Sequence, residues 1–217
     1  MTLFDIVKQM AHLGGQKHID HKMMRSADSD DPALLTHFSR NQPAMFRVQS
    51  STDCEVHLIS ESEDATSEFG RQLAAVLAPG CIVALIGDLG AGKTRLVQAI
   101  AIALDVPREQ VNSPTFTLVQ EYSGRLTLRH CDTYRLRDPD EFLDLGLDEL
   151  LAEDGVAFIE WADRVQHLLP RDVLRIEIRI VSPVAREFVI FANGRTSRGV
   201  LDRFNRQNEA VARDAGK

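Results

Sequence analysis

The chain has few cysteines and no long apolar run, and each shortage excludes a class of protein. Its 217 residues include only Cys54, Cys81 and Cys131, an odd number without C-x-x-C spacing. The sequence therefore predicts reduced thiols rather than a disulfide framework or a cysteine zinc site. No apolar run approaches the roughly 18 residues of a membrane-spanning helix, and the first ten residues lack the features of a signal peptide. We expect a cytoplasmic protein without membrane contact.

Basic side chains are also fewer than acidic ones, with 25 Lys and Arg against 32 Asp and Glu. The formal net charge is −7, and residues 1–54 hold six acidic and six basic side chains, so the whole negative excess lies in the remainder. An acidic body does not attract nucleic acid electrostatically. If RNA is involved, we expect it to be held by an RNA-binding partner rather than by this chain alone.

One stretch carries the clearest signal of chemistry. Residues 87–94 read GDLGAGKT and match the P-loop (Walker A) pattern G-x-x-x-x-G-K-[ST] in each fixed position. Its glycines let successive backbone N–H groups point inward and bind phosphate at a helix N-terminus. Lys93 is expected to reach the β/γ-phosphates, and Thr94 to contact Mg²⁺. A chance glycine-rich turn is the alternative, but an apolar run before the motif and a helical pattern after it favour nucleotide binding. The predicted nucleotide-binding residues here are Asp88, Leu89, Gly90, Ala91, Gly92, Lys93, Thr94 and Arg95.

Periodicity along the chain predicts an α/β domain. Strands are expected at 56–59, 81–86, 117–121, 125–131, 156–160, 174–180 and 187–192, and helices at 65–78, after the P-loop and near 163–169. The acidic stretch 140–150 is broken by Gly146 and is expected to form two short helices. Ser62 or Asp64 is the expected N-cap of the first helix. Short turns make antiparallel hairpins of 117–131 and of 174–192, the second with one solvated face. The predicted fold is a P-loop NTPase-like three-layer domain with a mixed, mostly parallel sheet.

This domain is expected to span residues 55–194. Residues 1–54 are polar and irregular, which predicts a largely disordered N-terminal extension with a short helix near 3–13. His18 and His21 lack a third ligand, so solvated histidines are favoured over a metal site. Residues 195–217 are predicted to form a polar C-terminal tail with weak helical character.

Hydrolysis requires more than a P-loop, because a carboxylate must hold Mg²⁺ and another group must position water. Asp132 and Glu160 each close a predicted strand, at the sheet edge where α/β folds bind ligands. A capping or solvated carboxylate is the alternative for each, and which one contacts Mg²⁺ directly stays open. Thr115 lies where a γ-phosphate-sensing switch is expected, or is an ordinary turn threonine. Trp161, the only tryptophan, follows Glu160 and either packs there or lies at the mouth of the site.

The absence of two motifs bears on the nucleotide. No Asn-Lys-x-Asp and no Asp-x-x-Gly occurs in the sequence, so the usual guanine-reading motif and a second GTPase switch are both missing. ATP is therefore favoured over GTP.

Taken together, these motifs resemble those of the TsaE (YjeE) family of bacterial P-loop ATPases. The resemblance rests on residues 87–94, 113–116 (SPTF), 130–136 (HCDTYRL) and 159–161 (IEW), in that order, and covers roughly residues 55–194. It implies a domain that binds ATP and Mg²⁺, hydrolyses ATP slowly alone, and supports tRNA threonylcarbamoyladenosine formation with the TsaB and TsaD proteins. Contact with tRNA is implied only indirectly, through that complex.

The resemblance also assigns roles by residue. It implies that Lys93, Glu160, Asp132 and Thr115 form the catalytic site, that Thr94, Glu160 and Asp132 lie at the metal, and that Trp161 and Thr66 lie near the nucleotide, Thr66 beside its base.

Two other functions stay open. A small-molecule kinase shares P-loop and Mg²⁺ chemistry, although no arginine-rich lid segment follows the P-loop helix. A non-catalytic module, in which Mg-ATP merely orders an interface, is the third.

Overall fold

The computed structural model describes residues 46–112, 114, 118–138, 140–143, 151 and 154–215. Three predictions lie outside these residues: the state of the chain before Phe46, including His18 and His21; the switch threonine Thr115; and the helical stretch over 144–150.

An eight-stranded mixed sheet is the frame of the domain. Its strands are β1 (Arg47–Ser51), β2 (Glu55–Ser60), β3 (Cys81–Ile86), β4 (Val119–Ser123), β5 (Thr127–Asp132), β6 (Gly155–Glu160), β7 (Leu174–Ile180) and β8 (Arg186–Ala192), in the order β1-β2-β8-β7-β3-β6-β5-β4. The central strands β7, β3, β6 and β5 are parallel, and the flanking pairings are antiparallel. Five of the eight described strands therefore run in one direction, which confirms the predicted mixed sheet and both predicted hairpins.

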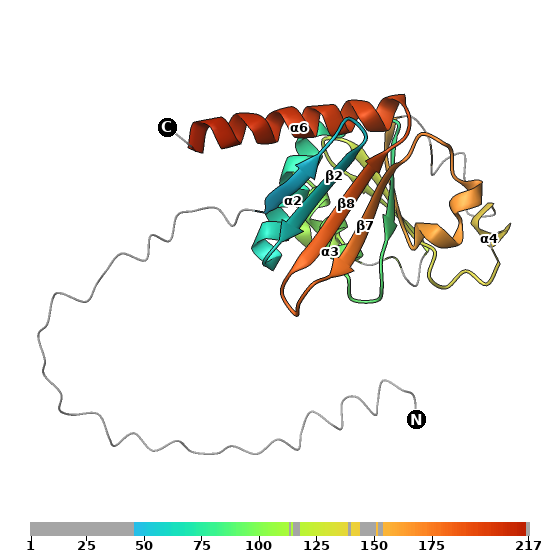
Figure 1. The fold of residues 1–217 in the computed structure, drawn as a ribbon. Coiled ribbons are helices and arrows are strands. Elements are labelled where there is room, and N and C mark those ends of the chain that lie inside the picture. The colour runs from blue at the N-terminus through green and yellow to red at the C-terminus, as the bar shows by residue number, and fades with distance from the viewer. Residues whose placement is uncertain are drawn as a thin grey trace, which may run out of the picture. The chain divides into compact units, whose positions relative to one another are not determined.

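Three helices cover one face of this sheet: α2 (Glu63–Val76), α3 (Lys93–Ala103) and α6 (Arg195–Ala215) (Figure 1). Ser62 is the N-cap of α2, since its side chain accepts a hydrogen bond from the Ala65 N–H at 3.0 Å. Helices α2 and α3 approach closely because Gly70 has no side chain, and a Cβ there would lie 2.6 Å from that of Ala99. This contact fixes α3, and with it the residues at the start of α3.

The opposite face has a thinner cover. In the described residues it consists of α4 (Asp140–Leu143) and two 3₁₀ turns, η2 (Ala162–Arg164) and η3 (Gln166–Leu168), which pack over β5, β6 and β3. The predicted helix near 163–169 is wrong. The chain enters η2 through Trp161 in a left-handed conformation (φ 57°), and Val165 breaks the helical geometry between the turns. Two short turns bring Ala162 and Val165 onto the sheet without a full helix.

Both predicted domain boundaries need correction. Before residue 55, β1 pairs with β2, and Phe46 packs against Phe69 and Phe204 with ring centroids 5.5 and 6.1 Å away. After residue 194, the predicted polar tail is the long helix α6, which buries Val200, Leu201 and Phe204. A narrow apolar stripe on an otherwise polar helix gives a weak sequence signal, yet three buried side chains suffice to attach α6 to the core.

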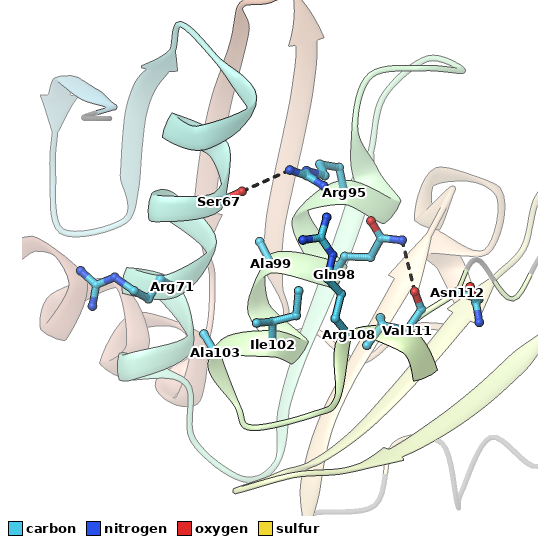
Figure 2. Close-up of a pocket in the computed structure, with 10 residues that line it drawn as sticks. All are labelled: Ser67, Arg71, Arg95, Gln98, Ala99, Ile102, Ala103, Arg108, Val111 and Asn112. Atoms are coloured by element: carbon cyan, nitrogen blue, oxygen red, sulfur yellow. Dashed lines mark hydrogen bonds between the residues drawn. The ribbon is translucent and has the colours of Figure 1, made fainter. Parts of the chain in front are cut away.

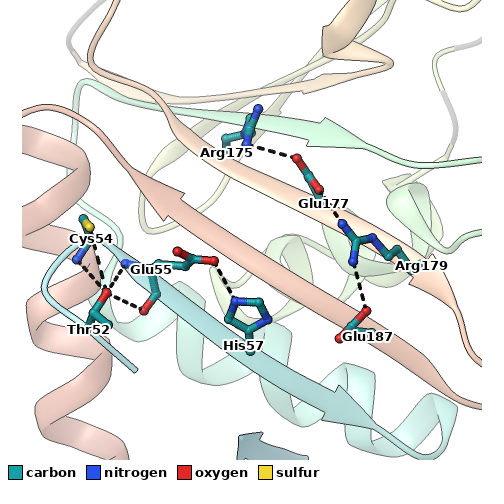
Figure 3. Close-up of polar contacts among 8 residues, drawn as sticks. All are labelled: Thr52, Cys54, Glu55, His57, Arg175, Glu177, Arg179 and Glu187. Atoms are coloured by element: carbon teal, nitrogen blue, oxygen red, sulfur yellow. Dashed lines mark hydrogen bonds and ion pairs between the residues drawn. The ribbon is translucent and has the colours of Figure 1, made fainter. Parts of the chain in front are cut away.

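The outer face of β2, β8 and β7 is polar, as predicted for the terminal hairpin. Arg175 contacts Glu177 at 3.0 Å, Glu177 contacts Arg179 at 3.2 Å, and Arg179 contacts Glu187 at 3.5 Å (Figure 3). On the same face, Glu55 contacts His57. Within the described residues, no helix is long and apolar enough to cross a membrane.

Candidate nucleotide site

The P-loop links the end of β3 to the start of α3 and is shaped by its glycines. Gly87, Gly90 and Gly92 have φ angles of 154°, 79° and 106°, a region that side chains disfavour. At Gly87 a Cβ would lie 2.5 Å from the Ile178 carbonyl oxygen, so only glycine fits between the loop and β7. The loop thus needs glycine for its backbone conformation, and at Gly87 for space as well.

Lys93, the first residue of α3, folds back over this loop. Its ammonium donates to the Gly87 carbonyl at 2.6 Å and to the Asp88 carbonyl at 3.0 Å, and it lies 3.6 Å from the centre of the Trp161 ring. The side chain is only 4% exposed. This burial lowers the pKa of the Lys93 ammonium, while the charges of Glu160, Asp132 and other nearby carboxylates act in the opposite direction. The loop therefore holds a poorly solvated cation where the motif predicts phosphate.

Glu160 joins the P-loop helix to the neighbouring strand. One carboxylate oxygen accepts a hydrogen bond from the Thr94 hydroxyl at 3.0 Å, and the other lies 2.7 Å from His130 Nε2. His130 is fully buried and Glu160 is 2% exposed. Because a carboxylate only accepts hydrogen bonds, His130 donates through Nε2. His130 Nδ1 has no hydrogen-bond partner among the described residues.

Asp132 lies beside Glu160 because β5 and β6 run parallel with these two residues in register. Both side chains extend toward the face that α3 covers, since Leu128 and Phe158 lie an even number of residues before them, share their strand faces and pack into that core. Asp132 accepts a hydrogen bond from the Tyr134 N–H at 2.9 Å. The predicted pair of strand-end carboxylates is thus assembled beside Thr94.

Trp161 forms one wall of the site, next to the Lys93 ammonium. Its left-handed conformation is uncommon for a bulky residue. The Thr133 hydroxyl shares its one proton between the Trp161 carbonyl at 2.8 Å and the Glu160 carbonyl at 3.0 Å, which holds the turn in place. The Trp161 ring packs against Tyr134 with centroids 4.9 Å apart. The two aromatic rings give the site an apolar side next to the Lys93 ammonium.

A cavity of about 320 Å³ connects these groups, with Leu89, Gly90, Gly92, Lys93, Thr94, Arg95, Asp132, Tyr134, Glu160 and Trp161 lining it. Of the predicted site residues, it brings together both carboxylates, the tryptophan and most of the P-loop. Asp88 contributes its backbone carbonyl to Lys93, and Ala91 is a buried residue of the loop that packs into the core.

A larger cavity, of about 490 Å³, lies between α2, α3 and the 3₁₀ turn η1 (Arg108–Gln110) (Figure 2). Arg95 lines both cavities and reaches Ser67 of α2 at 3.5 Å. Thr66 turns away from both, because its hydroxyl lies 2.7 Å from that of Ser60 and donates to the Ser62 carbonyl. Its place beside a nucleotide base therefore stays a prediction. Of the residues predicted to be catalytic, Lys93, Asp132 and Glu160 line the smaller cavity.

Sequence reasoning did not assign a role to His130, Thr133 or Tyr134. The sequence does place His130 on the same strand face as Asp132, because side chains two residues apart in a strand point to the same side. Its contact with Glu160 depends on the pairing of β5 with β6, which local sequence does not specify.

Comparison with known proteins gives a consistent match. Residues 60–188 match the family described as "Threonylcarbamoyl adenosine biosynthesis protein TsaE". The chain is 39% identical to a tRNA threonylcarbamoyladenosine biosynthesis protein TsaE of Treponema pallidum (strain Nichols), over 61% of this chain and 97% of that protein. It is 42% identical to the protein of the same name in Bacillus subtilis (strain 168), over 60% and 82%. It also resembles the crystal structure of Bacillus subtilis YdiB, with a TM-score of 0.61, 30% identity, and coverage of 73% of this chain and 99% of that one.

Proposed function

Because this chain belongs to the TsaE family of tRNA threonylcarbamoyladenosine biosynthesis proteins, we propose that it is a cytoplasmic Mg²⁺-dependent ATPase that acts on the TsaB–TsaD transferase. In this proposal it regulates or resets the transferase between turnovers and meets tRNA only through that complex. The observation that carries the proposal is the cavity in which Lys93, Thr94 and Glu160 meet at the P-loop.

Lys93 and the loop would bind the phosphates. The buried ammonium now contacts backbone carbonyls, whose partial charges compensate it less well than an anion would. A triphosphate placed in the loop supplies that anion, and the lysine stabilises charge that grows as the γ-phosphoryl group leaves. The Trp161 and Tyr134 rings limit access of water to Lys93 from one side.

The oxygen groups beside the loop fit Mg²⁺. This ion prefers oxygen ligands, takes few from the protein and keeps several waters. The Thr94 hydroxyl and the Glu160 carboxylate already lie 3.0 Å apart, and Asp132 is the neighbour of Glu160 in the sheet. In this proposal Thr94 and Glu160 hold the ion and Asp132 acts through water. The ion, when bound, neutralises phosphate charge.

Glu160 has a second role in the proposal, which is to orient the attacking water. His130 holds one carboxylate oxygen at 2.7 Å, so the carboxylate plane is fixed and the other oxygen stays at the Thr94 side of the cavity. A group fixed before reaction needs no reorganisation during it. Thr115 remains the predicted switch residue of this site.

The test measures ATP turnover by the purified chain, alone and with TsaB–TsaD. We expect slow turnover alone, stimulation by the transferase, and loss of the stimulated rate in Lys93→Ala and Glu160→Ala variants. A pull-down of TsaB–TsaD in ATP, in ADP and without nucleotide measures association in parallel. A deletion strain should have less threonylcarbamoyladenosine in its bulk tRNA, and normal levels would refute the pathway role.

Other outcomes point to the alternative functions. ATP-dependent association with unchanged background turnover in all variants would favour a nucleotide-dependent interaction module. Phosphorylation of a compound in a metabolite pool by the purified chain would favour a small-molecule kinase. Absence of ATP binding would reject all three.

A further inference from the structure

The outward side of the P-loop has a partner far away in the sequence. Arg186, the first residue of β8, donates from Nε to the Ala91 carbonyl at 3.0 Å and from Nη2 to the Gly90 carbonyl at 3.3 Å. Its side chain is partly buried, and it is not among the residues that line the P-loop cavity. Arg186 therefore contacts the loop from behind, away from the predicted phosphate position.

This contact determines how the loop presents its donors. In a trans peptide, the carbonyl of one residue and the N–H of the next point in opposite directions. Holding the Ala91 carbonyl against Arg186 thus directs the Gly92 N–H away from Arg186, toward the side where Gly92 lines the cavity. The preceding N–H, that of Ala91, is already bonded to the Asp88 carbonyl at 3.1 Å. The Gly92 N–H is consequently the one that Arg186 orients.

The same guanidinium also closes the β7–β8 turn, residues 181–185. Its Nη1 donates to the Ser182 and Ala185 carbonyls, both at 2.9 Å. Ser182 stabilises the turn further by accepting a hydrogen bond from the Ala185 N–H at 3.0 Å. Arginine suits this position because its planar fork carries five donors, whereas a lysine ammonium provides a single point of contact. One side chain therefore joins the turn to the P-loop.

We propose that Arg186 is a positioning residue of the nucleotide site, which orients the Gly92 N–H of the P-loop for phosphate and ties its orientation to the turn at 181–185. The inference rests on the proposed nucleotide binding at this loop. It predicts that loss of Arg186 weakens ATP binding without removing a group that touches the reacting phosphate.

The experiment compares wild type, Arg186→Ala, Arg186→Lys and the control Arg179→Ala, which removes an arginine of the same hairpin that forms ion pairs with Glu177 and Glu187. We measure the Kd for Mg-ATP by calorimetry and the KM and kcat of ATP turnover with TsaB–TsaD. Arg186→Ala should raise Kd and KM about tenfold, because hydrogen bonds to a charged group are lost. We expect kcat to change less than about threefold. Arg186→Lys should fall between wild type and Arg186→Ala, and Arg179→Ala should match wild type.

The outcomes distinguish an error in the proposed function from an error in the role given to Arg186. Wild-type protein that fails to bind ATP would contradict the proposed function itself. If wild type binds ATP and Arg186→Ala binds equally well, Arg186 does not position the loop. A merely structural residue would lower the melting temperature and the active fraction while leaving Kd and KM unchanged. If Arg186→Ala does not fold, Arg186→Lys decides the matter, and wild-type affinity in that variant overturns the inference.

Discussion

Replacement of Glu160 by two different residues can separate its structural contacts from its chemistry. Glu160→Ala removes the partner of both Thr94 and His130, and leaves the buried imidazole without a hydrogen bond to any described residue. An unpaired buried polar group costs about 1–3 kcal/mol of unfolding free energy. For a chain of this size each kcal/mol lowers the melting temperature by about 2–4 °C. Glu160→Gln keeps a side chain of the same shape that can bond to both partners, so it should change stability little.

Turnover should respond differently from stability. Both variants lack the carboxylate that we assign to Mg²⁺ and water, so both should lose about 100-fold or more in kcat with TsaB–TsaD present. The Kd for ATP should change by less than about fivefold, since the loop and Lys93 remain. Phosphate release, titration with ATP and urea unfolding measure the three quantities, and Glu187→Gln on the outer sheet face is the matched control. Wild-type turnover by Glu160→Gln, or equal loss of binding and turnover in both variants, would refute the assigned role.

Three further predictions concern the lysine, the thiols and the last helix. Lys93→Ala should lose most turnover and weaken ATP binding at least about tenfold, as measured by the same assays; full affinity would contradict a phosphate contact. Burial raises the pKa of the Cys81 and Cys131 thiols from 9.0 to about 12. Between these pH values the unfolded thiols release protons that the folded ones keep, so the free energy of unfolding should fall by about 1.4 kcal/mol per pH unit and thiol. In urea unfolding, a Cys81→Ala, Cys131→Ala double variant should show a smaller decrease of this free energy with pH. Phe204→Ala should cost about 3–5 kcal/mol in urea unfolding, because its buried ring packs against Phe69 and Phe46; a cost below 1 kcal/mol would mean that α6 is not attached as described.

The elements that position the P-loop could be predicted because their signals are local. Three signals lie within residues 81–104: the apolar run of β3, the glycines of the loop and the apolar face of α3. The periodicity or composition of each predicts one type of structure. Asp132 and Glu160 were found for a similar reason, since each ends a strand. The rule that parallel strands end at one edge of the sheet places both at that edge, but their adjacency depends on the pairing of β5 with β6.

Other features escaped prediction because they depend on tertiary contacts. Trp161 adopts a left-handed conformation that its residue type disfavours, and the shared hydrogen bond that holds the turn comes from the hydroxyl of Thr133, directly after β5. That turn also replaces the predicted helix near 163–169 by two 3₁₀ turns. Likewise, α6 is predominantly polar, so its attachment to the core becomes evident only when Phe204 is seen against Phe69 and Phe46.

The conformation of the P-loop depends both on its local sequence and on a tertiary contact. Its sequence specifies which backbone N–H groups can point inward, because glycines permit the necessary conformation at Gly87, Gly90 and Gly92. It does not specify what holds the outward carbonyls, and in this chain that donor is Arg186, about 95 positions away. The motif thus predicts the kind of ligand, while in our proposal the β7–β8 hairpin helps to set how tightly the loop is held for it. Two chains with identical P-loops but different residues at this hairpin position should therefore differ in ATP affinity more than in kcat.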